Sequence, residues 1–212
     1  MRKRTMLFAP LLAALIALTA CGTRASQASD PAEPSGSGSV EPYALSEEGQ
    51  FLLHAFQMDG SASILSVQVP EGARSLSITF YQWKEDGTWQ VLQSSGQNDA
   101  GGEAASFPDT GTITLEKQED GGVDCHLLLG SLVSFSIDGP AAGLNGMTAK
   151  AAAFLEGPQE AALETEVPLA VFVYDDGTQL PAFGTESFFD PSIFDGMALV
   201  QAVTLKFSGQ PL

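Results

Sequence analysis

SLSITFYQWKEDGTWQVLQS, residues 75–94, is the stretch that decides the fold of this chain. On both sides of the turn residues 84–87, apolar and polar side chains alternate, as they do in β-strands with one buried face. Asp86-Gly87 between two alternating segments is the strongest short signal of a β-hairpin, because it suits a type I′ turn. The stretch therefore predicts two antiparallel strands, at 75–83 and 88–94.

The same pattern of short alternating segments continues on both sides of this hairpin. Asp-Gly recurs at 59–60, 120–121, 138–139, 176–177 and 195–196, each near the end of a predicted strand. Many short strands with regular turn signals are typical of a β-sandwich or barrel. We predict a mainly β fold over residues 43–212, a single antiparallel β-sandwich of jelly-roll or immunoglobulin type. The other predicted strands are 51–57, 62–69, 110–117, 123–129, 132–138, 147–155, 165–174 and 197–207.

Little of the sequence favours helix. Residues 147–155 are rich in alanine, which has a high helix propensity, but their apolar phase also suits a strand, which is our prediction. Residues 158–163 predict one short helical turn, with Pro158 early in it. Residues 187–194 predict an irregular loop that carries aromatic anchors. The alternation in 197–207 predicts one buried face and one face toward solvent.

Tyr81 and Trp83 are the residues that most suggest ligand binding. They share the less apolar phase of their strand, opposite the phase that holds Phe80. A turn of two or four residues places Trp89 on the Phe80 side, whereas a three-residue bulged turn reverses this assignment. Exposed aromatic rings beside polar groups suit sugar rings or protein partners, because they bury a large area at small entropy cost. We predict Tyr81 and Trp83 as ligand-binding residues; the alternative is that another strand or loop covers them.

The charge of the chain limits its partners. It carries 26 acidic and nine basic residues, for a formal net charge of −17. Binding to nucleic acid rests on Lys and Arg contacts with phosphate, so the composition argues against a nucleic-acid partner. It also argues against direct adhesion to anionic lipid. A cationic partner, a metal ion or a cell-wall polymer remains compatible with this charge, as does a simple role in solubility.

No catalytic motif stands out in the sequence. The two histidines, His54 and His126, lie in predicted strands, and no zinc-site spacing or Gly-x-Ser-x-Gly motif is present. Cys125 alternates in phase with apolar neighbours, which predicts a small buried core residue, with His126 on the opposite face. The acidic loops around 175–177 and 190–195 do not match a calcium loop. We therefore predict no enzyme, no cofactor and no metal site.

The first 22 residues form a leader of recognisable type. Arg2, Lys3 and Arg4 precede an apolar run over 6–20 that is shorter than a membrane-spanning helix. The run ends in Leu-Thr-Ala-Cys-Gly, residues 18–22, which resembles the lipobox of bacterial lipoproteins. The resemblance implies cleavage after residue 20 and lipidation of Cys21, whose acyl chains, with a palmitate among them, would anchor the protein to the extracytoplasmic face of the cell membrane. The alternative is an ordinary secretory signal in which Cys21 is incidental.

The sequence between the leader and the sandwich predicts a flexible tether over 21–42, because it is rich in Ser, Pro and Gly and holds one large apolar residue, Val40.

The most favoured function is therefore a membrane-anchored, non-catalytic module that binds a glycan or a protein ligand at the cell envelope. Two alternatives stay open: an accessory envelope lipoprotein that acts through a protein partner around Phe188, Phe189 and Phe194, and a hydrolase without a recognisable motif.

Overall fold

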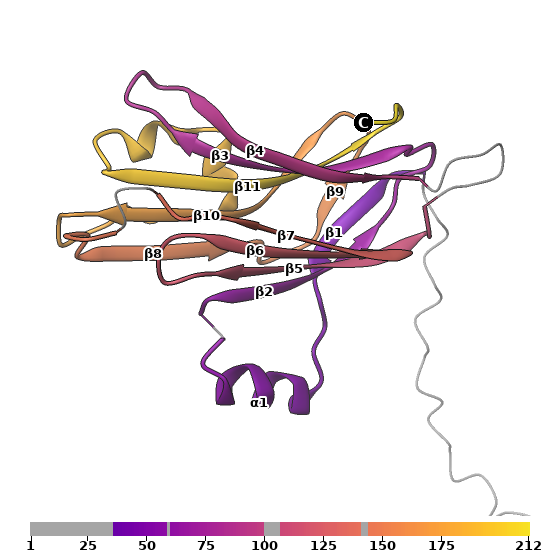
Figure 1. Cartoon of the computed structure of the whole chain (residues 1–212), viewed down its shortest axis with the longest axis horizontal. Coiled ribbons are helices and arrows are strands. Elements are labelled where there is room, and N and C mark those ends of the chain that lie inside the picture. Colours follow the sequence, from indigo (N-terminus) through magenta and orange to yellow (C-terminus); the bar gives the residue numbers. More distant parts are fainter. Residues whose placement is uncertain (1–35, 59, 100–106, 141–143) are drawn as a thin grey trace, which may run out of the picture. The chain divides into compact units, whose positions relative to one another are not determined.

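Two antiparallel sheets pack face to face in the computed structural model, which describes residues 36–58, 60–99, 107–140 and 144–212 (Figure 1). Ser35–Leu212 forms one compact unit. The helices are α1 (Glu47–Ala55) and two short 3-10 helices, η1 (Thr185–Phe188) and η2 (Pro191–Phe194). The strands are β1 (Gly38–Pro42), β2 (Ala62–Gln68), β3 (Ser75–Trp83), β4 (Trp89–Asn98), β5 (Thr110–Lys117), β6 (Val123–Leu129), β7 (Ser131–Ile137), β8 (Ala149–Phe154), β9 (Gln159–Ala161), β10 (Glu166–Asp175) and β11 (Leu199–Ser208).

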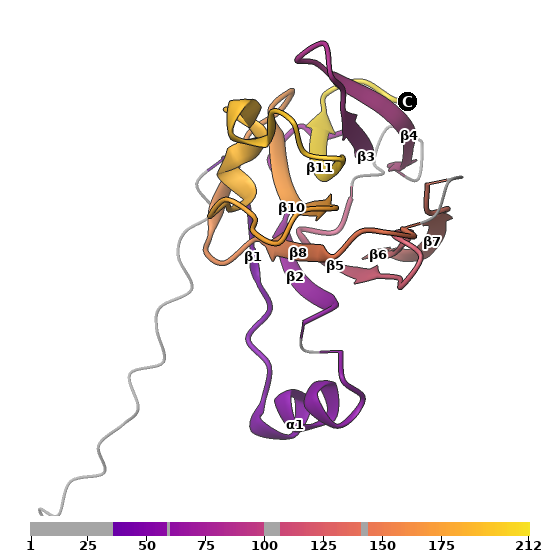
Figure 2. The same ribbon diagram turned by 90° about the vertical axis from the view of Figure 1, so that its left-hand side faces the viewer.

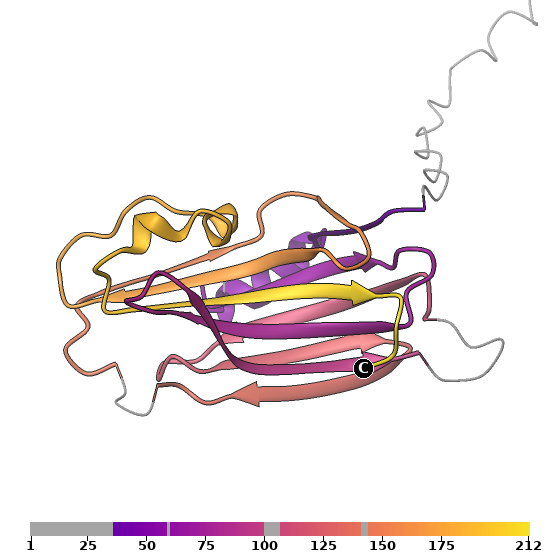
Figure 3. The same cartoon turned by 90° about the horizontal axis from the view of Figure 1, so that it is seen from above.

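Six of the described strands form sheet A, in the order β7-β6-β5-β2-β1-β9, and five form sheet B, in the order β4-β3-β11-β10-β8. The two layers are seen from the side in Figure 1 and from above in Figure 3. The β-sandwich prediction is confirmed. The two sheets together hold more strands than an immunoglobulin domain or a jelly roll contains.

The main core lies between the sheets. Alternation of apolar and polar side chains gives each core strand an apolar face, and this face points into the core. Leu65, Ile113 and Leu127 of sheet A are fully buried, as are Ile78 and Phe172 of sheet B. A fully buried side chain of this size contributes about 1.5–3 kcal/mol through removal of apolar surface from water. The buried apolar faces of several strands in both sheets, β3 of the 75–94 hairpin among them, therefore hold the two layers together.

Sheet B also buries part of its outer face. The segment between β10 and β11 folds back over these strands (Figure 2). Phe188 and Phe194 of this segment pack on Val171, Val173 and other apolar residues of the sheet. The prediction of a solvent-facing side for residues 197–207 is therefore wrong. The nearly continuous apolar run of β10 carried this signal, since strands buried on both faces lack alternation.

Three local predictions are wrong. Residues 51–57, predicted as a strand, belong largely to α1, whose N-cap Ser46 accepts a hydrogen bond from Gly49 N at 3.2 Å. Residues 158–163 contain the strand β9 instead of a helical turn, because the backbone of 159–161 pairs with β1. Residues 38–42, assigned to the tether, form β1 between β2 and β9 and bury Val40 completely. Of the remaining tether residues, 36 and 37 form a bend before β1, and 21–35 lie outside the described ranges.

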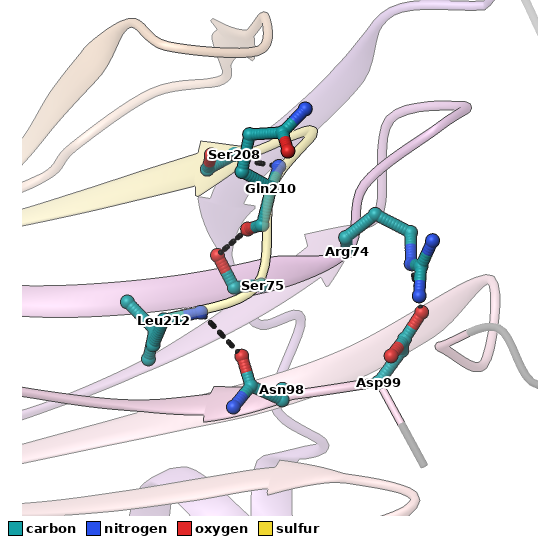
Figure 4. A network of polar contacts seen from close by, with 7 residues as sticks. All are labelled: Arg74, Ser75, Asn98, Asp99, Ser208, Gln210 and Leu212. Carbon is teal, nitrogen blue, oxygen red and sulfur yellow. Dashed lines mark hydrogen bonds and ion pairs between the residues drawn. The ribbon is translucent and has the colours of Figure 1, made fainter. Parts of the chain in front are cut away.

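The chain after β11 is tied to the start of β3 and the end of β4 (Figure 4). Ser75 Oγ donates a hydrogen bond to Gln210 O at 2.6 Å, and Leu212 N donates to Asn98 Oδ1 at 2.6 Å. Arg74, just before β3, pairs with the buried carboxylate of Asp99, just after β4. These contacts fix the end of the hairpin that lies opposite the 84–87 turn.

Candidate ligand-binding groove

A three-residue turn, 85–87, closes the β3–β4 hairpin. Lys84 N donates a hydrogen bond to Thr88 O at 3.0 Å, and Gly87 has a φ of +79°, a conformation that glycine adopts without steric cost. Asp86 Oδ1 accepts hydrogen bonds from the backbone N and the Oγ1 of Thr88, at 3.1 and 2.6 Å. The odd number of turn residues places Trp89 directly opposite Trp83, not on the Phe80 side.

The two tryptophans form a fixed aromatic pair on the outer face of sheet B. Their ring centroids lie 5.2 Å apart at an interplanar angle of 60°. Trp89 also stacks on Phe188, with centroids 5.2 Å apart at 26°, and its Nε1 donates a hydrogen bond to Phe188 O at 3.0 Å. Both tryptophans are half-buried. Because Trp89 is held on one face and at its polar atom, little side-chain entropy remains to be lost on binding a ligand.

The hairpin end and the chain between η2 and β11 enclose an open groove of about 1370 Å³. Trp83 and Trp89 line it on the hairpin side, and Asp195 and Met197 line it on the other. Gln82, Gln90 and Thr88 add amide and hydroxyl groups, and the charged lining residues are Lys84, Glu85, Asp86 and Asp195. The groove thus combines aromatic rings with hydrogen-bonding groups and an excess of negative charge.

Tyr81 lies beside this groove and does not line it. Its hydroxyl donates a hydrogen bond to Glu166 Oε1 at 2.5 Å, and its ring packs against Phe188 with centroids 5.4 Å apart. Burial, followed by the hydrogen bond and charge of Glu166, raises the pKa of Tyr81 above its usual value. Tyr81 therefore supports Phe188, which in turn supports Trp89.

Of the two residues predicted to bind ligand, the structure places Trp83 in the groove and Tyr81 behind it. Trp89, Asp195 and Met197 were not predicted as site residues. The number of residues in the turn determines where Trp89 lies, because only a three-residue turn brings Trp89 opposite Trp83. Nothing local in the sequence placed 195–198 beside a hairpin that lies more than a hundred residues earlier.

A second hollow, of about 420 Å³, lies on the outer face of sheet A. Its lining is mainly hydroxyl, amide and glycine groups, with Tyr43 as its aromatic residue and Leu128 as an exposed apolar one. Tyr43 has no aromatic ring packed against it among the described contacts, whereas the tryptophan pair of the hairpin groove is held on several sides. The hairpin groove is therefore the better organised of the two.

The histidines bear on the hydrolase alternative. His126 Nδ1 lies 2.8 Å from Ser134 Oγ across the β6–β7 pair, and both side chains are exposed. Asp124, the nearest acid on this face of β6, accepts a hydrogen bond from Gln118 Nε2 at 2.8 Å. His54 lies in the last turn of α1 rather than in a strand. A serine–histidine contact is thus present on the outside of sheet A, away from the hairpin groove.

The remaining sites of interest are structural. Cys125 is fully buried, as predicted, and burial raises the pKa of its thiol to about 12. Asp175 accepts hydrogen bonds from Gly177 N and Ala198 N, at 2.9 and 3.1 Å, so its carboxylate fixes the turn between β10 and the following segment. Within the described ranges, no three His, Cys, Asp or Glu side chains are placed to hold a metal ion.

The phenylalanines around η1 and η2 do not form a contiguous exposed patch. Phe194 is fully buried and Phe188 nearly so, whereas Phe189 is 65% exposed. Phe188 and Phe194 anchor the covering segment to sheet B, as the predicted aromatic anchors would. A protein partner at this place would contact Phe189 and its neighbours but not Phe194.

Cys21 lies outside the described residues. Among the residues that are described, no helix has the length and apolar character needed to cross a membrane. Comparison of the chain with protein-family models, with curated proteins and with solved structures finds no match.

Proposed function

We propose that the protein is a non-catalytic binding module of the bacterial cell envelope, held at the membrane by lipid on Cys21, and that it binds glycans in the groove between Trp83 and Asp195. The observation that carries the binding proposal is the Trp83–Trp89 pair, which lines an open groove among amide, hydroxyl and carboxylate groups. The leader of residues 1–22 supports the membrane address.

The chemistry of the groove matches that of a sugar. The flat, apolar faces of pyranose rings pack on aromatic side chains, and the hydroxyl groups around the ring require amide and carboxylate partners. Glu85, Thr88 and Asp195 supply carboxylate and hydroxyl groups in the lining of the same groove. Three carboxylates against one lysine favour neutral sugars and sugars with a free amine, and disfavour uronic acids.

The groove also has the form of a binding site for a chain of sugars. It is open to solvent and has a volume of about 1370 Å³, which is enough room for more than one sugar ring. The turn hydrogen bonds of Asp86 and the stacking of Trp89 on Phe188 hold the hairpin side in one conformation. Preorganisation of this kind lowers the entropy cost of binding.

Replacement of Trp83 by Ala tests this proposal. We expect the affinity of the full chain for its preferred oligosaccharide to fall about tenfold, the equivalent of ~1.4 kcal/mol, because the sugar loses an aromatic contact. A screen of neutral, amino and acidic oligosaccharides identifies the ligand, and calorimetry measures the affinity.

Val91→Ala is the control, since Val91 lies in β4 of the same hairpin, is 52% exposed and does not line the groove. A further pair, Glu85→Gln and Asp195→Asn, separates charge from stacking: both should reduce the preference for amino sugars over neutral ones. Equal affinities for Trp83→Ala and the unchanged protein, with both shown to be folded, would rule out the groove as the binding site.

A further inference from the structure

Helix α1 stands apart from the sandwich. It lies in the connection between β1 and β2, and the views in Figures 1 and 2 both show it projecting away from the two sheets. None of its residues is buried. Phe51 is 69% exposed, Leu52 52% and Phe56, the C-cap residue, 71%. We call residues 43–58 the arm.

The exposed apolar side chains of the arm lie on one side of the helix. At about 100° per residue, positions 51, 52 and 56 fall within an arc of about 140°. A helix of nine residues is too short to be stable in water by propensity alone, and helices in proteins normally owe their stability to a packed apolar face. The apolar side of α1 has no such contact in the sandwich, so a second surface is needed to cover it.

We propose that this second surface is the lipid bilayer, and that the arm inserts its apolar side into the headgroup layer of the membrane to which the protein is anchored. This inference rests on the proposed lipidation of Cys21. Even fully extended, the fifteen residues from there to Gly36 span no more than ~50 Å, so a lipidated chain keeps the domain within that distance of the surface. A surface so close is at a high effective concentration for the arm, and shallow apolar insertion then needs little intrinsic affinity.

The composition of the arm also fits the membrane interface and specifies which lipid it takes. Aromatic rings favour the boundary between headgroups and acyl chains. Residues 43–61 contain Glu47, Glu48 and Asp59 but no Lys or Arg. Glu48 shares the apolar side one turn before Leu52, which limits the depth of insertion to the headgroup layer. The arm therefore binds zwitterionic lipid and is repelled by anionic lipid.

A tryptophan placed on the arm tests the inference. The lipidated full chain with Phe51→Trp is reconstituted in phosphatidylcholine vesicles, and the fluorescence loss on substitution of brominated phosphatidylcholine is measured. Leu132→Trp is the matched control, because Leu132 is 66% exposed on β7, at the far edge of sheet A from β1. Trp83 and Trp89 contribute equally to both variants. We expect the fluorescence of the Phe51→Trp protein to be quenched several-fold more strongly than that of the Leu132→Trp protein. Its quenching should be weaker in vesicles that contain phosphatidylcholine and phosphatidylglycerol in equal amounts.

Equal quenching of the two variants would overturn the inference, and so would stronger binding to the anionic vesicles. The fluorescence emission of the Phe51→Trp protein could instead be blue-shifted without vesicles, and sedimentation could show a dimer. That result would assign the apolar side of the arm to contact with a second copy of the chain. Mass spectrometry of the same preparation separates the two proposals: a bare Cys21 refutes the anchor, whereas quenching on added vesicles still reports on the arm.

Discussion

Cys125 shows how the environment of one residue sets its chemistry. Its place on β6, between Leu115 of β5 and the neighbouring strand β7, leaves its sulfur without contact to solvent. Burial disfavours the charged thiolate and raises the thiol pKa to about 12. The same alternation turns His126 outward, as the sequence predicted, so the thiol and the imidazole lie on opposite faces of sheet A.

We expect the stability of the protein to fall as the pH rises above 9. The thiol pKa is raised from 9.0 in the unfolded chain to about 12 in the folded one, so the folded state retains a proton that the unfolded state loses. The stabilisation is complete below pH 9 and is lost as the pH approaches 12. For one such group the loss between pH 9 and 10 is about 1 kcal/mol. Urea unfolding at each pH measures it.

Cys125→Ala supplies the comparison. The substitution removes the titrating group, so the variant should lose less stability than the unchanged protein between pH 9 and 10, whatever its stability at pH 7. Burial also raises the pKa of Tyr174 to about 12, but from 10.0, so Tyr174 contributes mainly at higher pH. Parallel losses in the two proteins over this interval would show that the thiol is not the cause.

At the scale of elements, the sequence predicts strands better than their surroundings. The strands that alternate between turn signals, such as β3, β5 and β6, lie where the pattern places them. Residues 149–154 form a strand despite their alanine content, because pairing with β10 outweighs helix propensity. The strand predicted at 51–57 is a helix, and the signal was present: Ser46 followed by Glu47 and Glu48 is typical of a helix N-terminus.

The candidate groove was only partly predictable, because local patterns specify strands better than the packing of distant segments. Trp83 and its phase follow from alternation within one strand, which is local. The position of Trp89 depends on the length of one turn. The other wall depends on how the segment after β10 folds back on sheet B, and this is decided by long-range packing of Phe188 and Phe194 on Val171 and Val173, which no local pattern specifies.

Replacement of Phe194 by Ala should detach this covering segment. Phe194 is fully buried and its ring packs on Phe183 with centroids 5.7 Å apart, so its loss leaves a cavity under the segment. We expect the free energy of unfolding to fall by about 3–5 kcal/mol. Phe189→Ala, in the same segment, should lower the free energy of unfolding far less, because Phe189 is 65% exposed. Similar losses for the two variants in urea unfolding would contradict the role given to this segment.

At the scale of the whole molecule, several contacts join parts that are distant in sequence. Gln97 of β4, in sheet B, donates hydrogen bonds to Leu129 O and Ser131 Oγ of sheet A, at 2.9 and 3.0 Å. The chain end at 209–212 binds both strands of the hairpin, as Figure 4 shows. The hairpin that carries the groove is thus linked to the other sheet and to the end of the chain, which keeps its position fixed.

The proposed membrane address depends on Cys21, a residue outside the described ranges. If the proposal is correct, Cys21→Ala prevents incorporation of labelled palmitate in a bacterial host and releases the protein from the membrane fraction, because the proposed anchor consists of two acyl chains. Cys125→Ala, the control, removes the other cysteine and should leave incorporation unchanged. Persistent labelling of the Cys21→Ala protein would refute the lipid anchor.

The strand order of sheet B has a consequence for how the protein folds during its synthesis. β11, the last strand in the chain, lies in the middle of this sheet, between β3 and β10. A nascent polypeptide that is still attached to the ribosome through residues 199–208 lacks the strand on which both of these neighbours depend. Closure of sheet B therefore has to wait until residues 199–208 are available to pair with both β3 and β10.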